Sequence, residues 1–179
     1  MMQKTVLGVF LLTFFMSTEM VIYDFNDSSN PRDWRVVDDV VMGGVSSGNF
    51  DLTEDGHGLF YGKVSTDNYG GFSSIRHRAS IKDVDTYSHL VLRVKGDGKK
   101  YQIRVKASRF HYHSYIQYFK TTTSWQTIRI PLKDMYPTFR GRELNMENFA
   151  ASTIKEIAFL IGNKRNENFQ LLIDKIYLD

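Results

Sequence analysis

Apolar and polar residues alternate along most of the chain after Val21, in short segments separated by clusters of Gly, Asn, Asp and Ser. In residues 101–106, Tyr101, Ile103 and Val105 alternate with polar residues. Because side chains of a β-strand point alternately to its two faces, such a segment buries one face and exposes the other. The pattern predicts an all-β protein, built as an antiparallel β-sandwich of two packed sheets.

The same pattern marks the other expected strands. Residues 90–95 alternate in this way, and Gly-Asp-Gly-Lys at 96–99 separates them from residues 101–106. Since glycine tolerates a positive φ, we expect these two strands to form a hairpin. The remaining expected strands are 21–25, 48–52, 59–64, 72–78, 114–119, 125–130, 154–161 and 169–177, with short helical turns at 132–135 and 145–150.

The N-terminus has the pattern of a targeting segment. Lys4 precedes an apolar run over residues 6–16 that only Gly8 and Thr13 interrupt, which is typical of a signal peptide. As a helix this run reaches about 16 Å, roughly half the hydrocarbon thickness of a bilayer, so we expect no transmembrane span. We predict a signal peptide or apolar segment over residues 1–19 and one domain over residues 20–179. Export to the periplasm or cell envelope follows from this, with cytoplasmic retention as the alternative.

The composition of the chain argues against several classes of function. The chain has 179 residues, of which 42% are hydrophobic, enough for one sizeable core. Its net charge is only +3, and the basic residues between Arg93 and Arg109 alternate with apolar ones as on a solvated sheet face, so we expect no nucleic-acid partner. The absence of cysteine excludes disulfides and thiolate sites.

Catalytic motifs are missing from the sequence. It contains no Gly-x-Ser-x-Gly elbow, no phosphate-binding Gly-x-x-x-x-Gly-Lys loop and no His-Glu-x-x-His zinc helix. His111 and His113 share one face of an extended segment, but no third metal ligand is near them in the sequence. Asp38 and Asp39 are adjacent and would point to opposite faces of a strand, so they cannot flank one glycosidic bond. We expect no enzyme.

The two stretches of sequence that say most about function each contain a pair of adjacent glycines. Asp38 and Asp39 precede Met42, Gly43 and Gly44, and a second pair, Gly70 and Gly71, follows Asn68 and Tyr69. One hypothesis is structural: Asp38 or Asp39 forms a charge-assisted pair with Arg76 or Arg140 and ties the Met42 loop to the sheet. The alternative is that Asp39, Met42, Arg76 and Arg140, with Asn68 and Tyr69, line one end of the sandwich and present a surface for a ligand or partner.

Taken in order, these and other motifs resemble a known family. The matching pieces are Trp34, the run from Asp38 to Gly44 with Ser46, Gly70-Gly71-Phe72 with Ser74 and Arg76, Lys95 to Gly98 with Tyr101, Trp125 before Ile130-Pro131, Arg140-Gly141, and Ile173-Asp174 with Ile176. This order resembles the complex I intermediate-associated protein 30 family. The resemblance implies a galactose-binding-like jelly roll, akin to some carbohydrate-binding modules, with no assigned catalytic residues. Mitochondrial members assist the assembly of respiratory complex I.

Related sandwich modules often hold a structural calcium ion near their first and last strands. Asp24 and Asp174 resemble those positions, although two carboxylates are few for a cation that takes six to eight oxygens. We otherwise expect no cofactor.

Three functions remain open. A protein-interaction or assembly module comes first, and a carbohydrate-binding module of the cell envelope is the alternative. Sugars stack on exposed aromatic rings, so the second function is favoured if Tyr69, Tyr112 and Tyr115 are exposed together on a concave face. Tyr115 and its neighbours fit a core equally well by their spacing. An uncharacterised enzyme is the third possibility.

Overall fold

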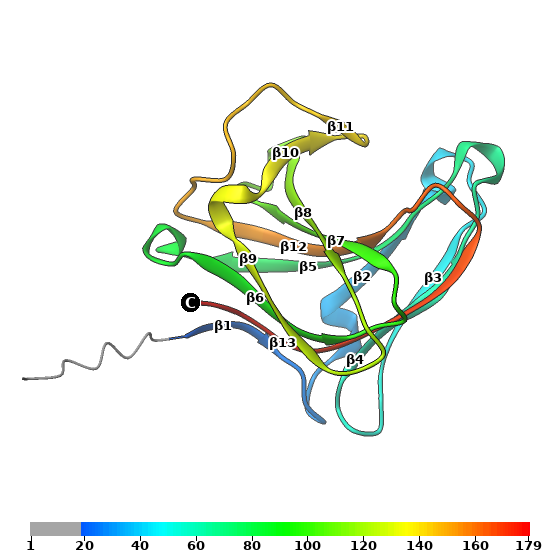
Figure 1. Cartoon of the computed structure of the whole chain (residues 1–179), viewed down its shortest axis with the longest axis horizontal. Coiled ribbons are helices and arrows are strands. Elements are labelled where there is room, and N and C mark those ends of the chain that lie inside the picture. The colour runs from blue at the N-terminus through cyan, green and yellow to red at the C-terminus, as the bar shows by residue number, and fades with distance from the viewer. Residues whose placement is uncertain (1–18) are drawn as a thin grey trace, which may run out of the picture.

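The computed structural model describes residues 19–179, apart from the side chains of Val41 and Met42. Its strands form two antiparallel sheets, joined by loops and 3-10 turns, with no α-helix in the described chain (Figure 1). The expected all-β antiparallel sandwich is therefore confirmed. The predicted signal peptide or apolar segment, residues 1–19, lies outside the described residues except for Glu19. Within residues 19–179, no helix has the length and apolar character needed to cross a membrane.

The first sheet has six strands. Its order is β3 (Ser47–Leu52), β4 (Gly58–Val64), β13 (Glu167–Leu178), β6 (His89–Lys95) and β9 (Gln126–Pro131), and β1 (Met20–Asp24) pairs with β13. The long strand β13 thus contacts three others, and its residues 171, 173, 176 and 178 are fully buried.

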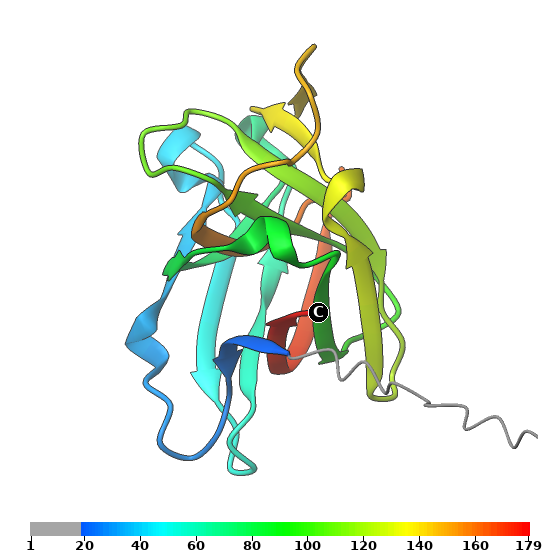
Figure 2. The same ribbon diagram turned by 90° about the vertical axis from the view of Figure 1, so that its left-hand side faces the viewer.

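The second sheet has seven strands. Its order is β11 (Arg142–Glu143), β10 (Tyr136–Phe139), β8 (Ser114–Lys120), β7 (Lys100–Lys106), β12 (Ile154–Ile161), β5 (Ser73–Ile81) and β2 (Trp34–Asp38). The 3-10 turns are η1 (Pro31–Asp33), η2 (Asp39–Met42), η3 (Asp67–Tyr69), η4 (Val84–Thr86) and η5 (Leu132–Asp134). Figure 2 shows β10 and β11, with the loop that follows them, projecting beyond the rest of the sandwich.

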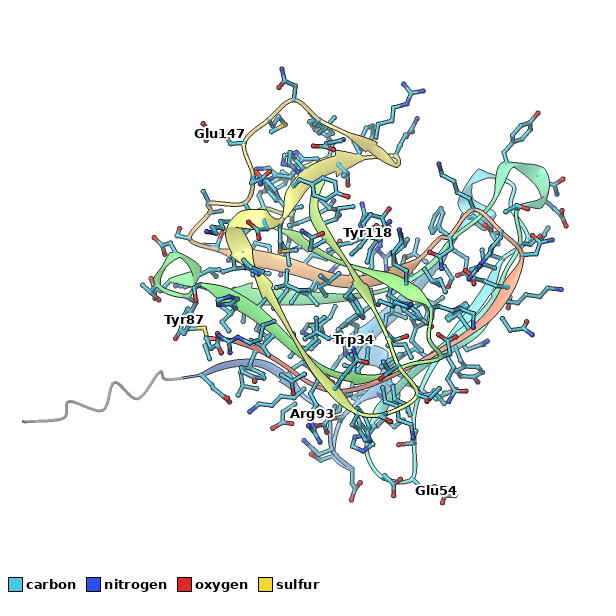
Figure 3. All side chains as sticks on the ribbon, in the orientation of Figure 1. Trp34, Glu54, Tyr87, Arg93, Tyr118 and Glu147 are labelled. Carbon is cyan, nitrogen blue, oxygen red and sulfur yellow. The ribbon has the colours of Figure 1, made fainter. Side chains whose placement is uncertain are left out.

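One core fills the space between the sheets. Trp34 lies between them (Figure 3), and its ring centroid is 5.7 Å from those of Phe25 and Phe50 and 6.0 Å from that of Phe159. These four rings come from both sheets, so the aromatic cluster joins the two layers. Burial of large rings is the main source of stability for such a core.

The predicted hairpin between residues 90–95 and 101–106 is wrong. Strand β6 belongs to the six-stranded sheet and β7 to the seven-stranded sheet, so residues 96–99 cross between layers. The carboxylate of Asp97 fixes this crossing, since it accepts hydrogen bonds from the Tyr101 hydroxyl at 3.1 Å and the Gln170 backbone N–H at 3.0 Å. Alternation alone shows that each segment is a strand, not which strand it pairs with.

The other strand predictions are close to the observed bounds, and residues 154–161 match β12 fully. Strands β2, β10 and β11 were not predicted, because their sequences carry short or broken alternation. The expected helical turn at residues 132–135 corresponds to η5, whereas residues 145–150 form no helix.

Candidate functional site

A buried carboxylate joins the two double-glycine loops. Asp39 is 1% exposed, and its Oδ1 accepts the Ser46 backbone N–H at 3.0 Å. Its Oδ2 accepts the Ser46 hydroxyl at 2.5 Å, the Gly71 N–H at 2.6 Å and the Phe72 N–H at 3.2 Å. Asp39 therefore connects the η2 loop to the η3 loop.

The glycines are required because the backbone closes tightly around Asp39. A Cβ at Gly44 would lie 2.4 Å from the Asp39 Cγ, and a Cβ at Gly70 would lie 2.5 Å from its Oδ2. Burial alone would raise the pKa of Asp39, but the hydrogen bonds from the Ser46 hydroxyl and the backbone N–H groups outweigh it and hold this pKa below its usual value. The carboxylate is therefore charged at neutral pH.

Three apolar side chains around this carboxylate point into solvent. Val40 is 61% exposed, Val45 53% and Tyr69 100%. Val40 follows Asp39 in the sequence, Val45 precedes Ser46, and Tyr69 precedes Gly70. Ser46 and Gly70 both lie against the Asp39 carboxylate. We call Val40, Val45 and Tyr69 the apolar loop end; η2 and η3 lie side by side at the upper right of Figure 1.

The backbone beneath Tyr69 is strained. Asn68 and Tyr69 have φ values of 53° and 62°, in the left-handed region that non-glycine residues rarely adopt. Asn68 is also exposed, so neither side chain gains burial from this conformation. The side chain of Met42, the remaining predicted residue of this loop, lies outside the described part of the chain.

The predicted ion pair between these aspartates and an arginine is wrong. Asp38 accepts the Gly48 N–H at 2.9 Å and the Ser73 hydroxyl at 2.5 Å. Arg76 Nη1 instead lies 3.9 Å from Glu156 Oε1. Arg140, with a φ of 49°, places its guanidinium 5.3 Å from the centre of the Phe139 ring. Backbone N–H groups and hydroxyls, rather than arginines, satisfy both carboxylates.

Arg76 belongs to a second surface, the face of the seven-stranded sheet that points away from the core. We call it the outer face. The strand register places six directly opposed residues in one row across it, which we call the arginine row: Arg35, Arg76, Ala158, Arg104, Ile116 and Tyr136. Opposed residues of neighbouring strands point to the same side, so all six share this face. Ala158 and Ile116 are buried although they lie outside the core cluster, which shows that the middle of the row is recessed.

A hydrogen-bonded network surrounds Arg104 in this row. Its Nη1 donates to Gln102 Oε1 at 2.6 Å and its Nη2 to the Thr138 hydroxyl at 3.5 Å. Gln102 in turn donates to the Tyr118 hydroxyl at 2.8 Å, and the Lys100 ammonium lies 4.2 Å from the centre of the Tyr118 ring.

The outer face is strongly basic. Burial, and next the positive charge of Arg76, lower the pKa of Arg104 to about 10, so it remains protonated at neutral pH. In the described strands the register gives this face seven basic residues and two acidic ones: Arg35, Arg76, Arg78, Lys100, Arg104, Lys106 and Lys120, with Glu143 and Glu156.

The predicted aromatic residues do not come together. Tyr69 lies just before β5, and Tyr112 lies just before β8. Strands β5, β12, β7 and β8 are neighbours and each pair is antiparallel, so β5 and β8 run in opposite directions and begin at opposite ends of the sheet. Strands of about seven residues therefore separate the two side chains by roughly 20 Å. Tyr112 is exposed and packs edge-on against Phe139, whereas Tyr115 is half-buried against Phe149.

The histidine pair lies beside Tyr112. The rings of His111 and His113 stack with centroids 4.9 Å apart, and both nitrogens of His113 are buried without a hydrogen-bond partner among the described residues. Burial, then the nearby His111 and Lys106, lower the pKa of His113. Over residues 19–179, no three His, Asp or Glu side chains gather as a set of metal ligands.

The two residues expected at a calcium site lie on neighbouring strands, β1 and β13. The Asp174 carboxylate is 2.9 Å from Arg93 Nε and 3.1 Å from His57 Nδ1, while Asp24 is exposed. A calcium ion would compete with Arg93 for Asp174. The structural calcium ion stays a prediction, checked by whether a chelator lowers the melting temperature.

Sequence reasoning missed Arg104, Gln102 and Thr138. The available signal was the alternation of residues 101–106, which assigns Gln102 and Arg104 to the solvent side of a strand. Nothing local indicates that β5, β12 and β7 are neighbours, so the sequence did not place Arg104 near Arg76.

Comparison with known structures supports the fold. The chain superimposes on the family 11 carbohydrate-binding module from Clostridium thermocellum, solved in complex with a β-1,3-1,4-mixed-linked tetrasaccharide, with a TM-score of 0.66 and 15% identity. The match covers 89% of this chain and 94% of that one. At this identity the likeness shows the fold, and it confirms the jelly roll.

Sequence comparison identifies relatives. The mitochondrial complex I intermediate-associated protein 30 of Drosophila melanogaster is 26% identical over 89% of this chain, and that of Mus musculus is 22% identical over 90%. The matched region spans only 62% and 56% of those two proteins. The model of the family described as complex I intermediate-associated protein 30 matches residues 23–173. Because that match covers most of the chain, the chain belongs to the complex I intermediate-associated protein 30 family.

Proposed function

We propose that the chain is a non-catalytic binding module that docks a partner protein through its apolar loop end, as an assembly factor does. The observation that carries this proposal is the fixed exposure of Val40, Val45 and Tyr69 around one buried carboxylate. Clustered apolar side chains in solvent cost free energy in an isolated protein and commonly mark interaction surfaces.

Hydrogen bonds also make the apolar loop end rigid. Four hydrogen bonds to Asp39 fix both loops, so little conformational entropy is lost when a partner binds. The fully exposed Tyr69 ring sits on a strained backbone at Asn68 and Tyr69, and such strain is often found at functional sites. The mitochondrial relatives are named as complex I intermediate-associated proteins, which supports an assembly role, and we extend it to this chain as docking of a partner protein.

Site-specific photocrosslinking tests this function. A photoreactive phenylalanine analogue replaces Tyr69 in one variant and Phe110 in the other, and both are expressed in the native cell. Phe110 is a matched control because it is 97% exposed and lies in the β7–β8 loop at the opposite end of the strands. We expect a discrete protein adduct at position 69 and none at position 110. Identical adducts at both positions, or none at position 69, contradict the proposal.

A second function is favoured by the outer face. The buried polar groups of Gln102 and Thr138, with the exposed Tyr118 beside them, are of the kind that positions sugar hydroxyls. The module of the same fold solved with a tetrasaccharide supports carbohydrate binding here. Calorimetric titration with mixed-linked β-glucan oligosaccharides tests it, with Gln102→Ala expected to weaken binding and Gln126→Ala, in the other sheet, expected to leave it unchanged.

We further propose that the protein is exported. Lys4 and the apolar run after it support export. N-terminal sequencing of the protein from native cells tests this, since an intact Met1 would contradict cleavage.

A further inference from the structure

Arg104 is a recessed cation on the outer face. Among the described residues it takes part in no ion pair, and its hydrogen bonds go to the neutral groups of Gln102 and Thr138. A charge removed from water is costly unless an opposite charge compensates it. The negative charge of Glu156 acts on Arg104, but no described carboxylate pairs with it directly, so the outer face keeps an excess of positive charge.

Arg76 reinforces this charge from the other side of β12. Ala158 is the register partner of both Arg76 and Arg104, so the two Cα atoms are about 10 Å apart, with the small Ala158 side chain between them. The nearest carboxylate contact of Arg76 is Glu156 at 3.9 Å, too long for a direct hydrogen bond. The Arg104 guanidinium reaches across β8 to Thr138, whereas Arg76 lies on the other side of Ala158. Both guanidinium groups are on the same face, and each can offer N–H donors to an oxyanion.

We propose that the outer face binds an acidic saccharide, with the carboxylate or sulfate groups of the sugar held by Arg76 and Arg104. This inference rests on the carbohydrate-binding candidate and names its ligand class. The groups adjoining Arg104 suit the rest of such a ligand, because the Gln102 amide and the Tyr118 and Thr138 hydroxyls can exchange hydrogen bonds with ring hydroxyls.

Other acidic ligands fit these observations less well. Single-stranded nucleic acids are held largely by stacking of bases on free aromatic rings. Tyr118 is 38% exposed, and the Lys100 ammonium lies over its ring. An acidic peptide would use the arginines but leave the adjoining hydroxyl groups without matching partners. These two ligand classes are retained as competitors in the experiment.

The test is isothermal titration of the full chain with five probes at one salt concentration: oligogalacturonate, a sulfated galactan oligosaccharide, a neutral mixed-linked β-glucan oligosaccharide, a poly-glutamate peptide and single-stranded RNA. We expect at least one acidic saccharide to bind ten-fold or more tightly than every other class. Arg104→Gln and Arg76→Gln should each weaken that binding about ten-fold. Lys63→Gln, which removes a positive charge from β4 in the other sheet, should leave it unchanged.

The outcomes separate this inference from the function on which it rests. If the neutral glucan binds as tightly as the acidic saccharides, carbohydrate binding stands and the acidic specificity is wrong. If no saccharide binds, both are wrong. Preferential binding of the peptide or the RNA also overturns the inference. Because the comparison of ligands uses the unaltered chain, it decides the question even if an arginine variant fails to fold, which circular dichroism would reveal.

Discussion

The carboxylate of Asp39 accepts the backbone N–H of Gly71 at 2.6 Å, although 32 positions separate the two residues in the sequence. The same carboxylate binds Ser46, so one side chain fixes the geometry of both double-glycine loops. The motif residues around it are thus explained by a local structural need: a buried acceptor and a backbone that can approach it closely.

Asp39→Ala should strongly destabilise the fold. The substitution leaves the N–H groups of Ser46, Gly71 and Phe72 without their acceptor, and the expected loss in the free energy of unfolding is about 3 kcal/mol or more. Urea denaturation measures it. Asp67→Ala is the control, because this exposed aspartate on the same loops should change stability by less than about 0.5 kcal/mol. Equal effects of the two substitutions would refute the role of Asp39.

The lowered pKa of Asp39 gives stability a defined dependence on pH. Its pKa in the folded state lies below that in the unfolded state, so the unfolded state binds the proton more tightly. The contribution of Asp39 is complete above the unfolded pKa of about 4 and is lost as the pH falls through the folded pKa. Between pH 6 and pH 3 the unfolding free energy should fall less steeply in Asp39→Asn than in the wild type. Parallel curves would exclude this linkage.

Gly44→Ala should cost more than a glycine substitution that only strains the backbone. The new Cβ at Gly44 would meet Asp39, and the crowding should cost about 2–3 kcal/mol. Gly98→Ala is the matched comparison, because its φ is +82° but no atom lies within 4 Å of the added Cβ. Its cost should be near 1 kcal/mol, from the left-handed conformation alone. Thermal and urea unfolding of both variants check the order, and a smaller loss for Gly44→Ala would be inconsistent with the tight approach.

Replacing Arg104 by Met should leave the fold as stable or make it more stable. The substitution removes a recessed charge that makes no direct ion pair with a described residue and retains an unbranched apolar side chain. We expect the relief of this charge burial to offset the lost hydrogen bonds to Gln102 and Thr138. The expected melting temperature is equal to or above that of the wild type. A fall of more than about 5 °C, on the order of 1–2 kcal/mol for a domain of this size, would show that Arg104 is retained for stability.

The sequence predicted the fold better than it predicted the site, and particular residues show why. Alternation identifies β12 and β7 because burial on one face repeats every second residue, as at Ile157 and Phe159. It could not show that residues 96–99 pass between the sheets, because that path depends on the contact between Asp97 and the distant Gln170. The sequence identified Asp39 as a candidate residue, but the arginines predicted as its partners were wrong. Its true partners are mostly backbone N–H groups, which every residue except proline has, so no residue type in the sequence points to them. The arginine row needed the strand order, which no local pattern contains.

The most direct test of the loop end separates docking from stability at Tyr69. Glycine adopts a positive φ without strain, so Tyr69→Gly should keep or slightly raise the melting temperature while removing the exposed ring. Phe110→Gly removes an equally exposed ring from the other end of the strands. Quantitative mass spectrometry of proteins that copurify from native cells should show the partner found by crosslinking reduced at least ten-fold in Tyr69→Gly and unchanged in Phe110→Gly. A folded Tyr69→Gly that retains the partner at the wild-type level would contradict docking through the apolar loop end.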